Sequence, residues 1–221
     1  MAPNETKAGQ VLAAYLKAKL ASQSGTSSIL SIDYPAPWAQ QRTAELKSTV
    51  AGDSNLKIAL SATTDPTNLI AGTQKTVNDE LTADSSLKGI WVAFDTAGQA
   101  AGQVVASRFA GKKFPDKPLV VTFHADPSTV SLMRTGAIDA VVDVNYDATA
   151  WELADAVAEH YARNKPWPKY GVSFKYPGIG DPLSYQIVTG ANLPPAKQYV
   201  APKVDVVTYF ITKWKTEGFG K

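Results

Sequence analysis

Apolar positions along the chain alternate between helical spacing and short unbroken runs. After Asn4, a good N-cap residue, Val11, Leu12 and Tyr15 begin an apolar pattern with the period of a helix. Further helices are expected at about residues 36–50, 66–81, 97–109, 127–136 and 147–163, and strands at 28–32, 56–60, 89–94, 119–123 and 140–144. The pattern therefore predicts alternating strands and helices over most of the chain.

Helix starts are marked by aspartate. Asp65-Pro66 and Asp126-Pro127 place a capping side chain directly before a proline in the first helical turn, and Asp147 is expected to cap the helix that reaches residue 163.

The expected strands are apolar throughout, which is typical of a parallel sheet with helices on both faces. The sequence thus predicts an α/β fold with an open, doubly wound, mostly parallel sheet. A closed barrel is the weaker alternative, because it typically needs eight such units.

The composition changes at residue 164, after which prolines and glycines become frequent. Here loops are expected, with strands at 172–174 and 185–188 and a final helix at about 203–214.

The overall composition excludes several classes of protein. Lys and Arg number 22 against 20 Asp and Glu, so the net charge of +2 gives no reason to expect a nucleic-acid partner. No apolar run approaches the roughly 18 residues of a membrane span, and residues 1–5 contain no signal region, so a soluble chain is expected. The absence of Cys excludes disulfides, thiolate zinc sites and cysteine nucleophiles.

Motifs typical of enzymes are also missing. The chain has no dinucleotide fingerprint, phosphate loop or nucleophile elbow, and its two histidines form no metal-binding motif. A phospho-receiver site would need an acidic pair where only Asp33 stands. A non-enzymatic protein without cofactor or metal is therefore expected.

In an open parallel sheet, ligands bind beyond the carboxyl ends of the strands. This rule selects the segments 33–42, 62–65, 94–96, 124–127 and 143–146. Trp38 lies in the first of them and could stack on a flat ligand face, whereas Trp91 lies within a strand and is expected in the core.

Several stretches carry a family resemblance in their order and spacing. Asn4 to Leu16 resembles an "N-x-x-x-A-G-x-x-x-A-x-Y-L" helix, and residues 38–42 resemble a segment that ends in an arginine. Residues 88–95 resemble a strand that ends in Asp, 121–127 a "V-G-F-D-x-x-P" segment, and 136–142 a "G-x-x-x-A-x-V" segment. Together they resemble the type I periplasmic binding proteins, the ribose-binding-like solute receptors of ABC transporters.

This resemblance implies two α/β lobes with a solute clamped between them. Residues 1–144 would form the second lobe, 145–171 a crossover and a helix that belongs to the first lobe, and 172–221 return strands and a tail that packs on the second lobe. Most of the first lobe would then be missing. The apolar face of the 147–163 helix would be exposed and would favour dimerisation, through the residues Leu153, Val157 and Tyr161.

The resemblance also assigns the candidate ligand-binding residues. Arg42 would fork onto ligand hydroxyls or a carboxylate, and Asp95 would either contact the ligand or cap the next helix. Phe94 replaces an Asn of sugar-binding relatives, and His124 replaces an Asp. His124 could donate or accept, and its charge would respond to pH.

Two further polar residues complete the implied site. Asp143 and Asn145 flank the position of a polar hinge residue, and one of them would take its role. With Trp38 as a stacking surface, the implied ligand-binding set is Arg42, Asp95, His124, Asp143, Asn145, Trp38 and Phe94.

The function implied is a receptor lobe for a sugar or sugar-like polyol that serves an ABC importer outside the cytoplasm, with the transporter permease as partner of the full-length protein. The alternative within the same fold is the effector domain of a LacI-type transcription regulator, whose helix-turn-helix does not occur in this sequence. An α/β enzyme with an unrecognised site is the third hypothesis.

Overall fold

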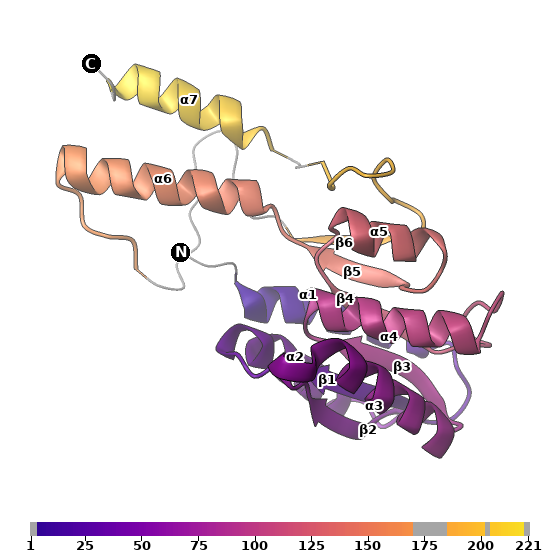
Figure 1. Cartoon of the computed structure of the whole chain (residues 1–221). Coiled ribbons are helices and arrows are strands. Elements are labelled where there is room, and N and C mark those ends of the chain that lie inside the picture. Colours follow the sequence, from indigo (N-terminus) through magenta and orange to yellow (C-terminus); the bar gives the residue numbers. More distant parts are fainter. Residues whose placement is uncertain (1–3, 170–184, 202–203, 219–221) are drawn as a thin grey trace. The chain divides into compact units, whose positions relative to one another are not determined.

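The computed structural model describes residues 4–169, 185–201 and 204–218. Helices and strands alternate from the N-terminus to residue 163 (Figure 1). The elements are α1 (Glu5–Leu20), β1 (Ser27–Asp33), α2 (Pro37–Ala51), β2 (Leu56–Thr63), the short 3-10 helix η1 (Pro66–Asn68), α3 (Leu69–Ala83), β3 (Leu87–Val92), α4 (Asp95–Arg108), β4 (Leu119–Phe123), α5 (Pro127–Arg134), β5 (Ala140–Asp143), α6 (Tyr146–Arg163), β6 (Gln186–Thr189) and α7 (Val206–Glu217).

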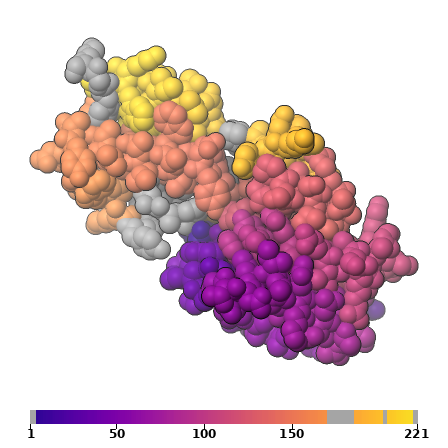
Figure 2. All heavy atoms as spheres, in the orientation of Figure 1, coloured from indigo at the N-terminus to yellow at the C-terminus, as the bar shows by residue number. Residues whose placement is uncertain are grey.

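The strands form one sheet in the order β2-β1-β3-β4-β5-β6. The neighbours from β2 to β5 pair in parallel. Helices α1 and α2 pack together on one face, while α3 and α4 pack on the other, where their atoms cover the sheet (Figure 2). The prediction of an open, doubly wound, mostly parallel sheet is confirmed.

The core lies on both faces of the sheet, as the apolar strands require. Every residue of β4 is buried, and Trp91 of β3 is a core residue that meets Phe123 edge-to-face, with ring centroids 5.4 Å apart. By contrast, β2 is an edge strand and is mostly exposed, so its apolar pattern is weaker. Because of this weak pattern, the sequence placed the end of the strand three residues too early.

Two of the three helix caps predicted at aspartate are confirmed. The Asp65 carboxylate accepts from the Thr67 amide, and the Asp126 carboxylate accepts from the amides of the two residues after Pro127. The third was wrong: Asn145, not Asp147, caps α6. Because the Asn145 side chain accepts from the Ala148 amide at 3.1 Å, the helix begins at Tyr146.

The chain divides into two compact units. The sheet unit comprises Glu5–Asp143 and Ile187–Val200, and a helical unit contains α6 and α7. The predicted strand at 172–174 lies outside the described residues, whereas the predicted strand at 185–188 is β6 and the predicted final helix is α7. Helix α7 packs on α6, because Val206 and Phe210 close an apolar cluster with Ala148. The assignment of residues 172–221 to the second lobe stays a prediction.

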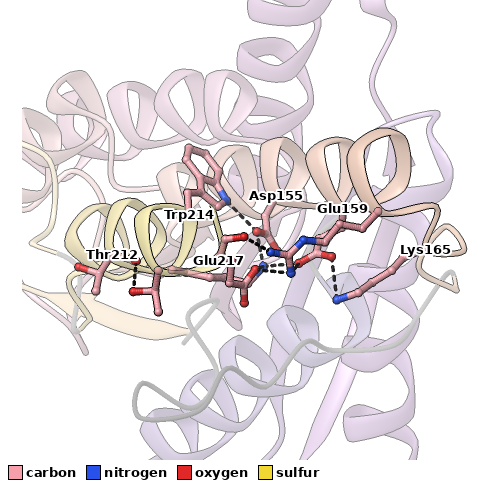
Figure 3. A network of polar contacts seen from close by, with 9 residues as sticks. Asp155, Glu159, Lys165, Thr212, Trp214 and Glu217 are labelled. Atoms are coloured by element: carbon pink, nitrogen blue, oxygen red, sulfur yellow. Dashed lines mark hydrogen bonds and ion pairs between the residues drawn. The ribbon is translucent and has the colours of Figure 1, made fainter. Parts of the chain in front are cut away.

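Charged groups also join α6 to α7. Lys213 of α7 donates to Asp155 and Glu159 of α6, and the Trp214 indole donates to Asp155 at 2.8 Å (Figure 3). Burial raises the pKa of Glu159, but hydrogen bonds from Lys165 and Lys213 outweigh it and lower the pKa to about 2. This carboxylate therefore stays charged over the whole working range of pH.

The predicted apolar face of α6 is exposed. Leu153, Val157 and Tyr161 are exposed, Tyr161 to 77%. Dimerisation through this face stays a prediction. Among the described residues, no helix has the length and apolar character needed to cross a membrane.

Gly9 allows α1 and α2 to approach closely. A Cβ at this position would lie 2.7 Å from the Arg42 carbonyl oxygen and 2.9 Å from its Cα, so the backbone of α2 would have to move. Gly9→Ala is expected to lower the free energy of unfolding of the sheet unit by about 1–3 kcal/mol. Urea unfolding followed by the NMR signals of β3 and β4 amides measures this unit directly.

Gly72→Ala in α3 is the matched control. A Cβ there meets only the Asn68 side chain at 3.7 Å, so the variant is expected to gain about 0.5–1 kcal/mol from helix propensity. If the two variants were equally stable, the contact between α1 and α2 could accommodate an added methyl group without a shift of the backbone.

Candidate functional site

The strand order reverses between β1 and β3, so a ligand-binding crevice is expected beyond the carboxyl ends of these strands. The chain leaves β1 toward β2 on one side and returns to β3 on the other, so the connections at the carboxyl ends of β1 and β3 diverge. Open parallel sheets bind ligands at this switch point. The segments that begin after Asp33 and after Val92 therefore border the candidate site.

Three partly exposed aromatic residues gather there, and we call them the aromatic cluster: Tyr34, Trp38 and Phe94. Tyr34 follows β1, Trp38 lies in the first turn of α2, and Phe94 joins β3 to α4. Tyr34 stacks on Trp38 with ring centroids 5.3 Å apart, and the Phe94 ring is 4.8 Å from that of Tyr34 and 5.6 Å from that of Trp38. The predicted residues Trp38 and Phe94 are thus brought together.

Arg42 lies beneath this cluster and is only 2% exposed. Its Nε donates to Glu5 Oε2 at 2.6 Å, its Nη1 to the Ala93 carbonyl at 2.9 Å, and its Nη2 to His124 Nε2 at 3.1 Å. The guanidinium carbon also lies 4.9 Å from the ring centroid of Trp38. Arg42 therefore connects α1, α2 and the ends of β3 and β4.

Glu5 is the buried counter-charge of Arg42. Sequence reasoning missed this role, and it also missed Tyr34 of the aromatic cluster. The signal for Tyr34 was available, because it stands four residues before Trp38 in the segment selected by the strand-end rule. The Glu5–Arg42 pair had no such signal, since its members are 37 residues apart.

His124 has a left-handed backbone, with φ at 65°, and its amide donates to the Val142 carbonyl. Because Arg42 can only donate, His124 Nε2 must accept, and the ring proton then resides on Nδ1. Burial lowers the pKa of His124 to about 3, and the positive charge of Arg42 adds to this shift. Its ring is therefore neutral near pH 7, and a response of its charge to pH is expected only in acid.

Asp95 is the first residue of α4, so Phe94 rather than Asp95 occupies the N-cap position. The Asp95 carboxylate accepts from the amide of Thr96 at 2.6 Å. Burial raises the pKa of Asp95, and the charge of Asp126 raises it further. The carboxylate thus lies at a helix start, next to Phe94 of the aromatic cluster. Its negative charge there interacts favourably with the positive, N-terminal end of the helix dipole.

The last two predicted residues have different structural roles. Asp143 accepts from the Ala125 amide at 2.8 Å and so ties the end of β5 to the loop that carries His124. Asn145 caps α6 and belongs to the helical unit, and its role in ligand binding stays a prediction.

These groups are suited to binding rather than to metal chemistry. Aromatic faces beside a small number of oriented polar groups are typical of pockets for small molecules. Within the described ranges, no three or more side chains of the metal-binding types come together as a metal site.

The fold is similar to solved structures of solute-binding proteins. One is a carbohydrate transporter solute-binding protein from Agrobacterium radiobacter in complex with D-arabinose, which is 20% identical with a TM-score of 0.68; the match covers 87% of this chain and 61% of that one. An ABC transporter solute-binding protein from Burkholderia graminis in complex with D-arabinose is 21% identical with a TM-score of 0.71, over 89% and 63% of the two chains.

A third similar structure is an ABC transporter solute-binding protein from Bacillus halodurans with bound myo-inositol. It is 14% identical with a TM-score of 0.67, over 86% of this chain and 60% of that one. The chain thus spans less than two thirds of the length of these three proteins.

No curated protein matches the chain in a sequence search. A family model does match it: the one described as periplasmic binding protein domain covers residues 1–165. The match extends from α1 through α6 and includes the whole aromatic cluster with Arg42 and His124. The resemblance inferred from the sequence motifs is confirmed, and the chain belongs to the periplasmic binding protein domain family.

Proposed function

We propose that this chain is part of a solute receptor of an ABC importer and that it binds a sugar or sugar-like polyol at the crevice between β1 and β3. The observation that carries the proposal is the aromatic cluster beside the buried Arg42 at the switch point. Family membership supports it, as do the arabinose and inositol bound by the similar structures.

The electrostatics of the site favour an uncharged ligand. Glu5 balances the charge of Arg42, and the low pKa of His124 keeps its ring neutral. An anionic ligand would have to compete with Glu5 for the guanidinium, whereas a polyol needs only hydrogen-bonding groups and an aromatic face. A neutral polyol therefore fits better than a sugar acid.

The lobe assignment is part of the proposal. Residues 1–144 would form the second lobe, and a cleft closed by hinge motion would need an opposing lobe as its other wall. In the full-length protein, Asp95, His124, Asp143, Trp38 and Phe94 would then line the solute site, with the buried Arg42 behind them, and Asn145 would lie near the hinge. The receptor would act outside the cytoplasm, deliver its solute to a transporter permease and catalyse no reaction.

A transcription regulator with the same fold is the less favoured reading. The three similar structures reported above are described as solute-binding proteins, which supports a receptor over a regulator.

Weak binding by the chain alone is the first expected outcome. One wall supplies about half of the hydrogen bonds of a closed cleft, so D-arabinose and myo-inositol are expected to bind with a Kd of about 1 mM or weaker. Titration followed by ¹H–¹⁵N NMR should shift the Trp38 indole and the amides of Phe94 and His124 first. Submicromolar binding would contradict the half-cleft assignment, and polyols that leave these signals unmoved at tens of millimolar would refute the sugar site.

Trp38→Ala tests the stacking surface. The variant removes the largest ring of the aromatic cluster and is expected to weaken polyol binding about fivefold to tenfold, since aromatic stacking contributes about 1 kcal/mol. Trp167→Ala removes an exposed tryptophan of the helical unit and serves as the matched control. The ratio of the two Kd values measured by the same NMR titration decides the result, and a ratio near one would exclude Trp38 from the site.

The neutral His124 predicts a specific loss of stability in acid. Its folded pKa of about 3 lies below the unfolded value of 6.5, so the stabilisation is complete above pH 6.5 and is lost as the pH falls toward 3. When the pH falls from about 7.5 to about 5, the unfolding free energy should drop by about 2 kcal/mol because of this group.

His124→Asn is the variant that isolates this effect. Asn tolerates the left-handed backbone and carries no ionisable group. Its shorter side chain loses the contact with Arg42, but that loss lowers the stability equally at both pH values and leaves the pH-dependent difference to His124. Urea unfolding measures the drop in unfolding free energy between the two pH values. This drop should be about 2 kcal/mol smaller for the variant than for the wild type. The same loss in both proteins would mean that His124 titrates normally.

A further inference from the structure

A second hollow opens at the opposite edge of the sheet, where β4 and β5 begin. It encloses about 700 Å³ and lies between the ends of α1, α4 and α5. We call it the basic hollow because of the charged residues in its lining, which are Lys19, Lys112, Lys113, Lys117, Arg134 and Asp139. Five cations against one carboxylate give the lining a net charge of +4, while the entire chain carries only +2.

The floor of the hollow is a buried ion pair. Lys117 is 3% exposed, and its Nζ donates to Asp139 Oδ2 at 2.6 Å and to the Pro118 carbonyl at 3.3 Å. The same carboxylate oxygen accepts from the Val120 amide at 2.8 Å. Asp139 is therefore already engaged, while a lysine ammonium has three N–H groups and can still donate to a further acceptor.

Tyr15 adds a neutral donor to the lining. Burial raises the pKa of its hydroxyl, and the negative charge of Asp139 raises it further, so the group stays protonated. A protonated phenol beside a buried ammonium can donate to an incoming oxygen acceptor.

Part of this positive charge has an ordinary structural reason. Lys19 and Arg134 lie in the last turns of α1 and α5, where cations interact favourably with the helix dipole. The three helix ends together supply about −1.5 elementary charges. Lys112, Lys113 and Lys117 lie in the connection between α4 and β4, outside any helix, so the hollow remains positive.

We propose that the basic hollow binds a small polyanion that carries phosphate or carboxylate groups. Its volume lies within the range of about 300–1,000 Å³ typical of sites for small molecules. Lysine ammoniums recognise such oxyanions as point charges, and the buried Lys117 supplies the charge at the floor. This site lies in the sheet unit, at the edge opposite the polyol crevice, so it does not depend on the proposed function.

Inorganic pyrophosphate and citrate are the probes, because they separate a preference for phosphate from one for carboxylate. In NMR titrations at about 20 mM salt, either anion should shift the signals of Tyr15, Lys112, Lys113 and Lys117 with saturation. Because the attraction is electrostatic, the affinity should fall about tenfold or more when the salt is raised to about 200 mM. Glycerol, an uncharged polyol, should leave these signals unchanged.

The decisive comparison uses two double variants that each remove two lysine charges. Lys112→Gln with Lys113→Gln should weaken binding about tenfold or more, because two charge-assisted contacts are lost. Lys47→Gln with Lys57→Gln removes two exposed charges outside the hollow and should leave the Kd within about twofold. None of these substitutions touches the buried Lys117–Asp139 pair, so the fold is preserved.

The proposal is overturned by equal weakening in both double variants, which would indicate binding to net charge alone. It is equally overturned by anion-induced shifts that centre on Trp38, or by the absence of saturable shifts for both anions at low salt.

Discussion

The buried guanidinium of Arg42 is the constraint on which the candidate site depends. A charge that is 2% exposed is tolerated only when its donors are matched, and here Glu5, the Ala93 carbonyl and His124 match them. Removing one partner of such a buried pair typically costs about 3–5 kcal/mol. The contacts therefore fix the start of α1, the second turn of α2 and the ends of β3 and β4 relative to one another.

The chemistry of the crevice follows from this constraint. Because the buried Glu5 carboxylate neutralises Arg42, the guanidinium acts as a rigid support for Trp38 rather than as a free cation. The same arginine holds His124 as an acceptor, and burial together with the charge of Arg42 lowers the pKa of His124 and keeps its ring uncharged. The surface presented at the switch point is thus aromatic and nearly neutral, and this is the basis of the proposal that it binds an uncharged polyol. Gly9 is part of the arrangement, because its missing side chain lets α1 reach the backbone of Arg42.

The sequence predicted the parts of the fold that depend on local signals. The apolar run 119–123 became β4 with the same bounds, and the Asp-Pro pairs mark the starts of η1 and α5. The strand-end rule also selected the segments that carry Trp38, Phe94 and His124.

The sequence could not predict contacts between residues that are far apart along the chain, such as Glu5 with Arg42. It also could not predict the packing of α7 on α6, which rests on Val206, Phe210 and the Lys213 network. The prediction of Asp147 as the cap of α6 was wrong by two residues, because Asn145 is also a good cap and stands directly before the first helical residue.

The two edges of the sheet differ in charge because the parallel strands orient the helices. Helix N-termini gather at the carboxyl edge, where Asp65, Asp95 and Asp126 accept from helix amides or lie in a first turn. Helix C-termini gather at the opposite edge, where Lys19, Arg108 and Arg134 lie in last turns. Asp65 and Asp126 accept from the amides of the helices that they cap, and the Asp95 carboxylate accepts from the Thr96 amide, so these acids already have partners in the helix starts. At the other edge the lysines of the α4–β4 connection exceed what the helix ends require, and this excess of positive charge is the basis of the proposed anion site.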